Sequence, residues 1–221
     1  SHTICNMKRL VVFDLDGTLI NSIADLTVAV NQALVACGYP THSEQECSMM
    51  VGNGVRKLFE RALPEGERTE ENIERIRELF IPFYDIHNAD LSRPYEGICE
   101  LLGELQARGI MMAVASNKYH SATQKLIAHY FPNIRFEVVL GHREGVPAKP
   151  HPQIVDDIIA HTGVLKEDIL YVGDTSVDMQ TAANAGVDVI GVSWGYRPRE
   201  ELAAHNPLAI IDHPNELIGY L

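Results

Sequence analysis

The fold is decided by the stretch LVVFDLDGTL, residues 10–19, in which an apolar run ends abruptly in two acidic residues. Apolar runs that are bounded by turn residues are typical of buried strands. Side chains two residues apart in a strand point the same way, so we expect Asp14 and Asp16 to leave the strand end together, before a turn at Gly17. Two such carboxylates stay ionised only beside a cation, unless one of them holds a proton. The stretch therefore predicts a metal site, a nucleophile or an acid/base pair.

Most of the remaining chain alternates between short apolar runs and amphipathic stretches. This alternation predicts βαβ units, and hence an α/β fold in which helices cover both faces of a parallel sheet to give three layers. The expected strands are residues 10–13, 110–115, 136–140, 169–172, 187–192 and 209–211, and the expected helices are residues 97–107, 121–130, 153–161, 176–185 and 199–205.

Residues 21–89 break this alternation because they contain helical patterns but no convincing strand. Apolar residues recur on one helical face after Ile23 and again after Ile73, and Ser43 followed by Glu46 fits a capping box. These stripes are most simply the core of an all-helical insert that packs on itself. We therefore expect a core domain of residues 1–20 and 91–221 and an inserted helical domain of residues 21–90.

The composition favours a packed interior and an acidic surface. The chain has 221 residues, 46% of them hydrophobic, and a net charge of −12. An acidic surface argues against nucleic acid or an anionic membrane as partner, and no apolar run approaches the roughly 18 residues of a membrane span. We expect a cytoplasmic protein with reduced thiols, because there is no apolar signal-peptide core and no CxxC pair among Cys5, Cys37, Cys47 and Cys99. Whether residues 1–6 are native is left open.

Polar side chains follow the expected strands at the edge where open α/β sheets bind their ligands. Carboxylates supply the oxygen ligands that suit Mg²⁺, and a lysine with a hydroxyl beside such a metal suits a phosphoryl group. Each residue alone has a structural explanation, as a helix cap, a solvated loop charge or a turn, but their coincidence at one edge favours a functional site. The residues are Asp14 and Asp16, Ser116 and Asn117, Lys149, and finally Asp174 and Asp178.

Four segments carry a resemblance to a known family. DLDGTL at residues 14–19, Ser116-Asn117, Lys149 and GDTSVD at residues 173–178 resemble the four motifs of the haloacid dehalogenase (HAD) superfamily. The match spans nearly the whole chain, and the helical insert lies where that superfamily carries its first cap type. The resemblance implies a HAD-like, Rossmann-like parallel sheet core with an inserted all-helical cap domain.

The resemblance also implies a role for each residue of the motifs. Asp14 would be the nucleophile that becomes an aspartyl phosphate, and Asp16 would act as general acid and then general base. The cofactor would be Mg²⁺, and the transferring phosphoryl oxygens would be held by the residues of the second and third motifs. The implied metal residues are Asp14, Asp16 through its backbone carbonyl, Asp174 and the supporting Asp178, and the implied phosphate-binding residues are Ser116, Asn117 and Lys149.

The resemblance favours phosphate ester hydrolysis over dehalogenation, because the dehalogenases lack an acid at the position of Asp16 and a halide needs no proton. Asn21-Ser22, VGNG at residues 51–54 and SNK at residues 116–118 look most like phosphoglycolate phosphatases. We therefore expect a small phosphorylated metabolite such as 2-phosphoglycolate as substrate. The alternatives are an inorganic pyrophosphatase, a sugar phosphomutase resembling β-phosphoglucomutase, and, as the weakest, a non-catalytic phosphate-binding protein.

The helical insert offers two further candidates for substrate contact. Asn53 and Arg56 follow the glycine-rich turn of residues 51–54, which either faces the substrate or only joins two helices. A cap of this kind would close over the site and exclude water. The sequence is compatible with either a monomer or a homodimer.

Overall fold

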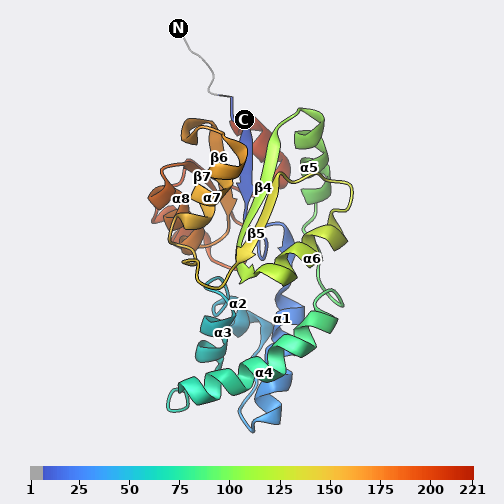
Figure 1. Ribbon diagram of the computed structural model, residues 1–221, viewed down its shortest axis with the longest axis vertical. Coiled ribbons are helices and arrows are strands. Elements are labelled where there is room, and N and C mark those ends of the chain that lie inside the picture. The colour runs from blue at the N-terminus through green and yellow to red at the C-terminus, as the bar shows by residue number, and fades with distance from the viewer. Residues whose placement is uncertain (1–6) are drawn as a thin grey trace.

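The computed structural model describes residues 7–221 (Figure 1), so Cys5 and the open question of residues 1–6 lie outside the described residues. Its centre is a six-stranded sheet in which every neighbouring pair of strands is parallel. Across the sheet the strands follow the order β5 (Val138–His142), β4 (Met111–Tyr119), β1 (Leu10–Phe13), β6 (Ile169–Gly173), β7 (Asp188–Val192) and β8 (Ala209–Ile211).

Strand β1 lies inside the sheet, between β4 and β6, and all of its residues are fully buried. Val11 and Phe13 belong to one hydrophobic cluster, whereas Leu10 and Val12 belong to another. Alternate side chains of a strand point to opposite faces, so β1 contributes to the core on both sides of the sheet. This explains why the sequence of β1 is apolar throughout rather than alternating.

Helices cover both faces of the sheet, which gives the three layers that the alternating sequence predicts. Figure 1 shows α5 and α6 on one side of the strands and α7 and α8 on the other. The first face is covered by α5 (Ile98–Ala107), α6 (His120–Tyr130) and the 3₁₀ helix η2 (Pro214–Tyr220), and the second by α7 (Gln153–Thr162), α8 (Ser176–Ala185) and α9 (Arg199–Ala203), while the 3₁₀ turn η1 (Lys166–Asp168) leads into β6.

Between β1 and β4 the chain makes a helical segment, residues 23–87, with a hydrophobic core of its own. In Figure 1 this segment lies below the sheet, beyond the lower ends of β4 and β5. Its centre is aromatic: Phe80 makes an edge contact with Phe59 and stacks on Tyr84. The helices are α1 (Ile23–Ala36), α2 (Glu44–Ser48), α3 (Val55–Ala62) and α4 (Glu70–His87), and Ser43 and Glu46 form the expected capping box.

The helical segment is joined to the sheet by two chain crossings that lie side by side. Strand β2 (Ile20–Asn21) pairs antiparallel with β3 (Arg93–Pro94). The buried carboxylate of Asp25, in the first turn of α1, accepts hydrogen bonds from the backbone N–H groups of Leu91 and Ser92. The two crossings are therefore tied to each other where the helical segment begins and ends.

The expected strands and helices of the sheet layers are all present, with ends displaced by a few residues. The first strand after the helical segment, Arg93–Pro94, pairs only with β2, and the parallel sheet resumes at Met111. The cysteines in the described part of the chain, Cys37, Cys47 and Cys99, are free thiols. Within residues 7–221 no helix combines the length and the apolar character needed to cross a membrane.

Candidate active site

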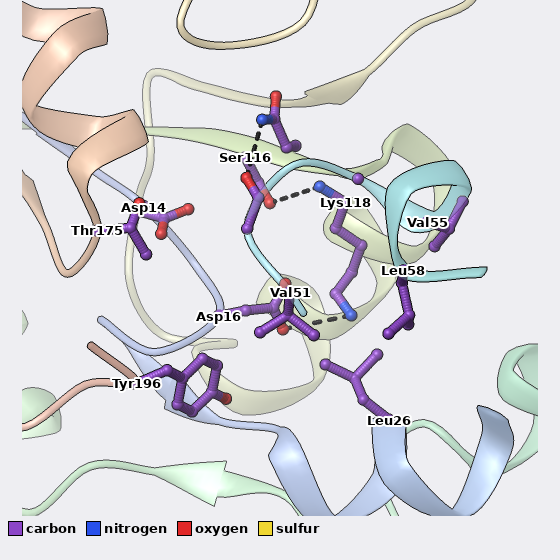
Figure 2. A pocket seen from close by; sticks show the side chains of 13 residues that line it. Asp14, Asp16, Leu26, Val51, Val55, Leu58, Ser116, Lys118, Thr175 and Tyr196 are labelled. Carbon is purple, nitrogen blue, oxygen red and sulfur yellow. Dashed lines mark hydrogen bonds and ion pairs between the residues drawn. The ribbon is translucent and has the colours of Figure 1, made fainter. Parts of the chain in front are cut away.

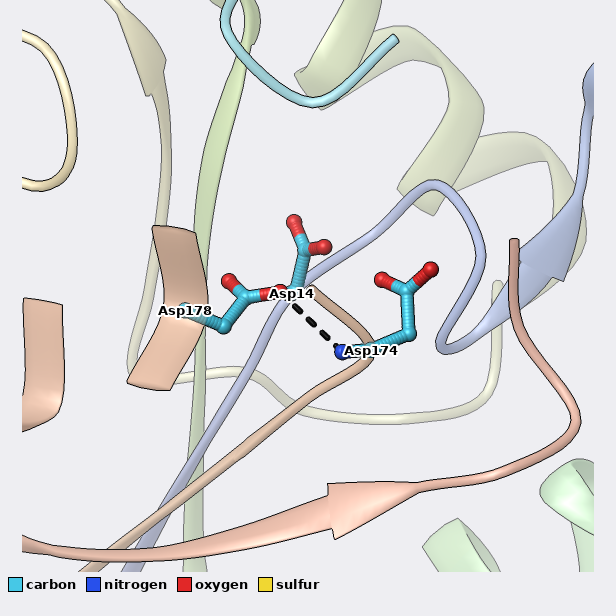
Figure 3. Close-up of side chains that lie close together, drawn as sticks. All are labelled: Asp14, Asp174 and Asp178. Carbon is cyan, nitrogen blue, oxygen red and sulfur yellow. Dashed lines mark hydrogen bonds between the residues drawn. The ribbon is translucent and has the colours of Figure 1, made fainter. Parts of the chain in front are cut away.

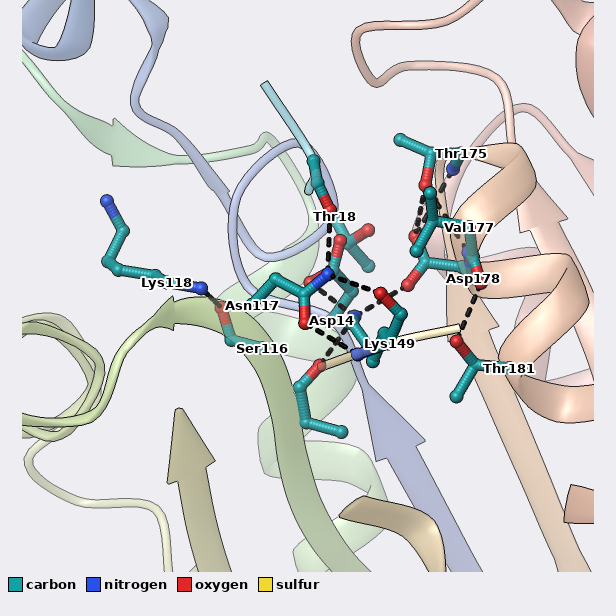
Figure 4. Close-up of polar contacts among 12 residues, drawn as sticks. Asp14, Thr18, Ser116, Asn117, Lys118, Lys149, Thr175, Val177, Asp178 and Thr181 are labelled. Atoms are coloured by element: carbon teal, nitrogen blue, oxygen red, sulfur yellow. Dashed lines mark hydrogen bonds and ion pairs between the residues drawn. The ribbon is translucent and has the colours of Figure 1, made fainter. Parts of the chain in front are cut away.

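The carboxyl ends of β4, β1 and β6 lie side by side and bring polar residues to one edge of the sheet (Figure 4). Asp14 directly follows β1, and its backbone N–H donates to the carbonyl of Val172 in β6 at 3.0 Å. Ser116 is buried within β4, and Asp174 is buried directly after β6. These strand ends therefore meet at the edge where the sequence places a ligand site.

Three buried carboxylates form the centre of this edge (Figure 3). Asp14, Asp174 and Asp178 each offer an oxygen atom, and these oxygens lie within 4.8 Å of one another. Burial, reinforced by the charge of Asp178, raises the pKa of Asp14 well above its ordinary value and raises the pKa of Asp174 to about 7. The cluster is thus short of positive charge, and its hard oxygen donors fit a divalent cation.

Asp178 differs from the other two carboxylates because both of its oxygens are already occupied. One oxygen accepts from Lys149 Nζ at 2.8 Å and from the Tyr171 hydroxyl at 2.7 Å, and the other accepts from the backbone N–H groups of Asp174 and Thr175. Burial disfavours the ionised form, but Lys149 and these hydrogen bonds hold the pKa of Asp178 below its ordinary value. Asp178 therefore fixes Asp174 and Lys149, and Asp14 and Asp174 keep more free lone pairs for a metal.

Lys149 places a buried positive charge directly beside Asp14. Its ammonium donates to Asp14 Oδ1 at 3.2 Å, to Asp178 at 2.8 Å and to the Tyr171 hydroxyl at 2.9 Å. Burial disfavours the charged form, yet the carboxylates of Asp14 and Asp178 raise the pKa of Lys149 well above its ordinary value. This ammonium is a permanent cation that can neutralise the oxygens of a phosphoryl group.

Asn117 shapes the site through its side-chain amide. The carboxamide oxygen accepts from the Lys149 backbone N–H at 2.9 Å, and the amide nitrogen donates to the Lys149 carbonyl at 3.1 Å and to the Gly52 carbonyl at 3.0 Å. The side chain is therefore committed to holding the Lys149 loop against the glycine-rich turn of the helical segment. Its backbone N–H is the group that the resemblance assigns to the phosphate.

Asp16 faces away from the carboxylate cluster and toward the helical segment. Its Oδ1 accepts from the Ser22 hydroxyl and pairs with Lys118 Nζ at 3.2 Å. The carboxylates of Asp14 and Asp16 thus line one pocket but have different neighbours. Asp14 lies beside three other charged groups, whereas Asp16 lies beside a serine and a lysine. This separation lets the two acids carry different chemistry.

The pocket that contains Asp14 and Asp16 is small, about 50 Å³, and lies between the sheet edge and the helical segment (Figure 2). Its polar walls come from the sheet side and include Ser116, Lys118, Thr175 and Tyr196. Its other walls are apolar and come from the helical segment, namely Leu26, Val51, Val55 and Leu58, with Gly52 and Gly54 between them.

Asn53 and Arg56, the two candidates for substrate contact in the insert, line a neighbouring outer pocket of about 610 Å³ instead. Arg56 pairs there with Glu60 and Glu70, and its side chain is 44% exposed. The outer pocket shares Gly54, Val55 and Asn117 with the inner one. The structure therefore brings the core motifs together but leaves these two residues outside the pocket that contains Asp14 and Asp16.

The comparison with known protein families decides which family this geometry represents. A family model described as haloacid dehalogenase-like hydrolase matches residues 11–192, which include every motif residue described above. The chain belongs to the haloacid dehalogenase-like hydrolases. Within this hydrolase family the chain is a phosphatase, as relatives at 31% to 35% identity over most of its length indicate.

Relatives of this hydrolase match over almost their whole length. A phosphoglycolate phosphatase of Vibrio parahaemolyticus is 35% identical over 95% of this chain and 94% of its own, and one of Haemophilus influenzae is 31% identical over 96% and 98%. The crystal structure of a predicted phosphoglycolate phosphatase from Haemophilus somnus superposes with a TM-score of 0.89, at 31% identity over 96% of this chain and 97% of that one.

Several residues of the hydrolase site escaped the sequence interpretation. Tyr171 lies in the apolar run of β6 and is indistinguishable there from a core residue, yet its hydroxyl bridges Lys149 and Asp178. Tyr84 lies four residues after Phe80 on α4, so its spacing indicates only packing. The one sequence signal for Lys118 as a site residue is that it directly follows Ser116 and Asn117. Its position in the pocket depends on contacts with α4, which the sequence does not show.

Proposed function

We propose that the protein is a Mg²⁺-dependent phosphomonoester hydrolase that acts through an aspartyl phosphate on Asp14, with 2-phosphoglycolate as the favoured substrate. The observation that carries this proposal is the position of Asp14, between the ammonium of Lys149 and the carboxylate of Asp174, at the floor of a pocket that also contains Asp16. The names of the relatives at 31% to 35% identity support the substrate.

In the first step a carboxylate oxygen of Asp14 attacks phosphorus, and the bond between phosphorus and the ester oxygen breaks. Lys149 and the Ser116 hydroxyl lie at the sheet edge where they would hold the phosphoryl oxygens, with the backbone N–H of Asn117 beside them. Asp16 donates its proton to the leaving alkoxide, which needs that proton because an alkoxide is a poor leaving group. The first product is an alcohol, and the enzyme carries an aspartyl phosphate.

In the second step Asp16, now ionised, takes a proton from a water molecule. The water oxygen attacks phosphorus, and the bond between phosphorus and Asp14 breaks to release inorganic phosphate. Asp14 and Asp16 thereby return to their starting states. Splitting the displacement into two steps lets one carboxylate serve as acid and then as base.

The proposed metal ligands are the carboxylates of Asp14 and Asp174 and the backbone carbonyl of Asp16, with Asp178 orienting Asp174. When bound, Mg²⁺ would supply positive charge to the phosphoryl oxygens and the nucleophile. In the protein itself, the occupied lone pairs of Asp178 leave Asp14 and Asp174 as the better donors.

We further propose that residues 21–90 form a cap domain over a core domain of residues 1–20 and 91–221. The apolar wall of the pocket comes from that segment, so its closure would exclude water during transfer. Asn53 and Arg56 are proposed as substrate contacts from the neighbouring pocket only. The free thiols and the acidic composition fit a cytoplasmic enzyme, either monomer or homodimer, whose partner is a small phosphorylated metabolite.

The test is a phosphate-release screen of the purified protein over small phosphomonoesters, pyrophosphate and sugar phosphates, with and without Mg²⁺. We expect stoichiometric release from 2-phosphoglycolate that requires Mg²⁺, with kcat/KM at least about tenfold above the other substrates, or about 1.4 kcal/mol of barrier. A preference for pyrophosphate, activity that depends on a sugar bisphosphate, or no hydrolysis at all would overturn the proposal.

A further inference from the structure

The catalytic pocket contains a second buried lysine that the proposed two-step mechanism does not use. The side chain of Lys118 is 3% exposed, and its ammonium points into the pocket beside Asp16 (Figure 2). Burying a lysine costs free energy unless its charge is compensated, so an ammonium in this position requires a partner. Burial accordingly lowers the pKa of Lys118, although the neighbouring Asp16 opposes this shift.

The position of the Lys118 ammonium is fixed from both sides of the pocket. It hydrogen-bonds the hydroxyl of Tyr84 from α4, and it lies 4.3 Å from the centre of the same ring. On the sheet side it lies 3.2 Å from Asp16 Oδ1. An ammonium has three N–H donors, so with these two partners one donor stays available to a ligand in the pocket.

The neighbourhood of Lys118 is the place where the leaving group must lie. In the proposed mechanism Asp16 protonates the ester oxygen, so the carbon atoms attached to that oxygen extend past Asp16. Apart from Lys118, the walls that they meet are largely apolar, with Leu26, Val51 and Leu58 close to the ammonium (Figure 2). A single cation beside the apolar wall of a pocket of about 50 Å³ favours a leaving group that is small and carries one negative charge.

We infer that Lys118 is a specificity-determining residue that binds the carboxylate of the leaving group. The inference rests on the proposed function and deepens it, because it names the group that selects a phosphorylated hydroxy acid over a phosphorylated neutral alcohol. In 2-phosphoglycolate the carboxylate is attached to the carbon next to the ester oxygen, so it reaches the ammonium while that oxygen stays beside Asp16. Tyr84 acts as a positioning residue that holds the ammonium from α4.

The competing explanation is that Lys118 acts only through Asp16, with which it forms an ion pair. The two explanations differ in their dependence on the leaving group. A lysine that acts on Asp16 affects every ester to a similar extent, whereas a lysine that binds a carboxylate affects only esters that carry one. The ratio of kcat/KM between two esters of the same size, one acidic and one neutral, therefore separates them.

The experiment compares 2-phosphoglycolate with 2-hydroxyethyl phosphate, in which an alcohol replaces the carboxylate. For the wild-type protein we expect kcat/KM for the acidic ester to exceed that for the neutral ester by about 30-fold or more, as a charged hydrogen bond in a buried site provides. Lys118→Met should reduce this ratio to within about threefold of one, because the substrate carboxylate is then buried without a partner. Lys118→Arg, which keeps the charge, should retain a clear part of the preference.

Lys57→Met is the matched control, because Lys57 lies on α3 of the same helical segment, pairs with Glu60 and is half exposed. Removing this charge should leave the ratio as in the wild type. If Lys118→Met fails to fold, Lys118→Gln replaces it in the same comparison. Binding of both esters to Asp14→Asn, with and without the Lys118 substitution, then gives the ratio by calorimetry without any turnover.

Three results would overturn the inference. If Lys118→Met lowers kcat/KM equally for both esters, so that the ratio is retained, Lys118 acts only through Asp16. A wild-type protein that hydrolyses both esters equally well would remove the role of Lys118 while the phosphatase function stands. A wild-type protein that hydrolyses neither ester would overturn the proposed function, and the inference with it.

Discussion

At the scale of single residues, Asp14 and Asp16 have the same side chain and similar positions but different partners. Asp14 lies among two carboxylates and Lys149, whereas Asp16 lies between Ser22 and Lys118. The sequence rule that residues two apart share a face applies within a strand, and β1 ends at Phe13. Beyond that point the turn decides the direction of each side chain, so the different surroundings of the two acids could not be read from their spacing.

Replacing the nucleophile should remove activity without harming the fold. Asp14→Asn keeps the shape of the side chain but cannot form an aspartyl phosphate, so we expect phosphate release to fall by at least about 1,000-fold, or about 4 kcal/mol of barrier. Burial and Asp178 already raise the pKa of Asp14, so a neutral side chain is tolerated at this position. The Asp14→Asn protein should therefore unfold at the same temperature as the wild type or at a higher one. Substantial residual activity in a folded Asp14→Asn protein would contradict the assignment.

Gly17 allows both a backbone turn and the close approach of the Asp174 carboxylate. Its φ is +83°, and a Cβ atom there would collide with the carboxylate of Asp174. We expect Gly17→Ala to displace Asp174, to raise the Mg²⁺ concentration needed for half-maximal activity by about tenfold or more, and to lower kcat, since metal ligands tolerate little displacement. A Mg²⁺ titration of phosphate release measures the effect.

Gly38→Ala is the control for that substitution, because Gly38 has a similar φ of +79° but no heavy atom within 4 Å of the added Cβ. It should cost about 1 kcal/mol of folding stability through backbone strain alone and leave the Mg²⁺ titration as in the wild type. Equal effects of the two substitutions on the titration would show that strain, and not displacement of Asp174, is responsible.

At the scale of elements, the strands and helices followed from the sequence because their signals are local. Continuous apolar runs and helical stripes depend on neighbouring residues only, and the capping box at Ser43 and Glu46 is a pattern of four residues. The short pair β2 and β3 was missed, because Asn21 and Arg93 are far apart in the sequence and neither flanks an apolar run. Their pairing arises only once the helical segment has folded back.

The helical segment should depend on the aromatic contacts at its centre. Phe80 is fully buried between Phe59 and Tyr84, so Phe80→Ala should lower the free energy of unfolding by about 3–5 kcal/mol. It should also loosen Tyr84, the partner of Lys118. The measurement is denaturant unfolding with a probe in the helical segment.

Ile86→Ala is the matched control on the same helix, because the Ile86 side chain is 75% exposed. Its effect should stay within about 0.5 kcal/mol. If Phe80→Ala costs no more than this control, the aromatic cluster does not stabilise the segment and the packing described for α4 is wrong.

At the scale of the whole molecule, the site is assembled from distant parts of the chain. Lys149, Tyr171 and Asp178 meet through the sheet order that places β1 between β4 and β6, and Tyr84 reaches Lys118 from the inserted helices. The motif residues could be listed from the sequence, because each lies beyond an apolar run. The sequence does not show which of these residues position others, as Asp178 and Asn117 do. That role depends on hydrogen bonds across the sheet edge.

The excess of buried negative charge predicts that Mg²⁺ stabilises the folded protein. Ligands that bind only the folded state add about 2.7 kcal/mol at 100 times their dissociation constant, so the unfolding temperature should rise by about 5–10 °C. Asp174→Asn removes one proposed ligand and should abolish most of this increase. The measurement is thermal unfolding with and without EDTA. If Mg²⁺ raises the unfolding temperature of Asp174→Asn as much as that of the wild type, the metal binds elsewhere.

The central claim, that Asp14 is phosphorylated during turnover, is tested most directly in Asp16→Asn with p-nitrophenyl phosphate. Nitrophenolate leaves without a proton, so the first step should proceed while the second, which needs a base, stops. We predict a burst of about one nitrophenolate per active site and, after borohydride reduction, homoserine at position 14 by mass spectrometry. Steady nitrophenolate release without a burst, with Asp14 unmodified, would contradict the aspartyl-phosphate mechanism.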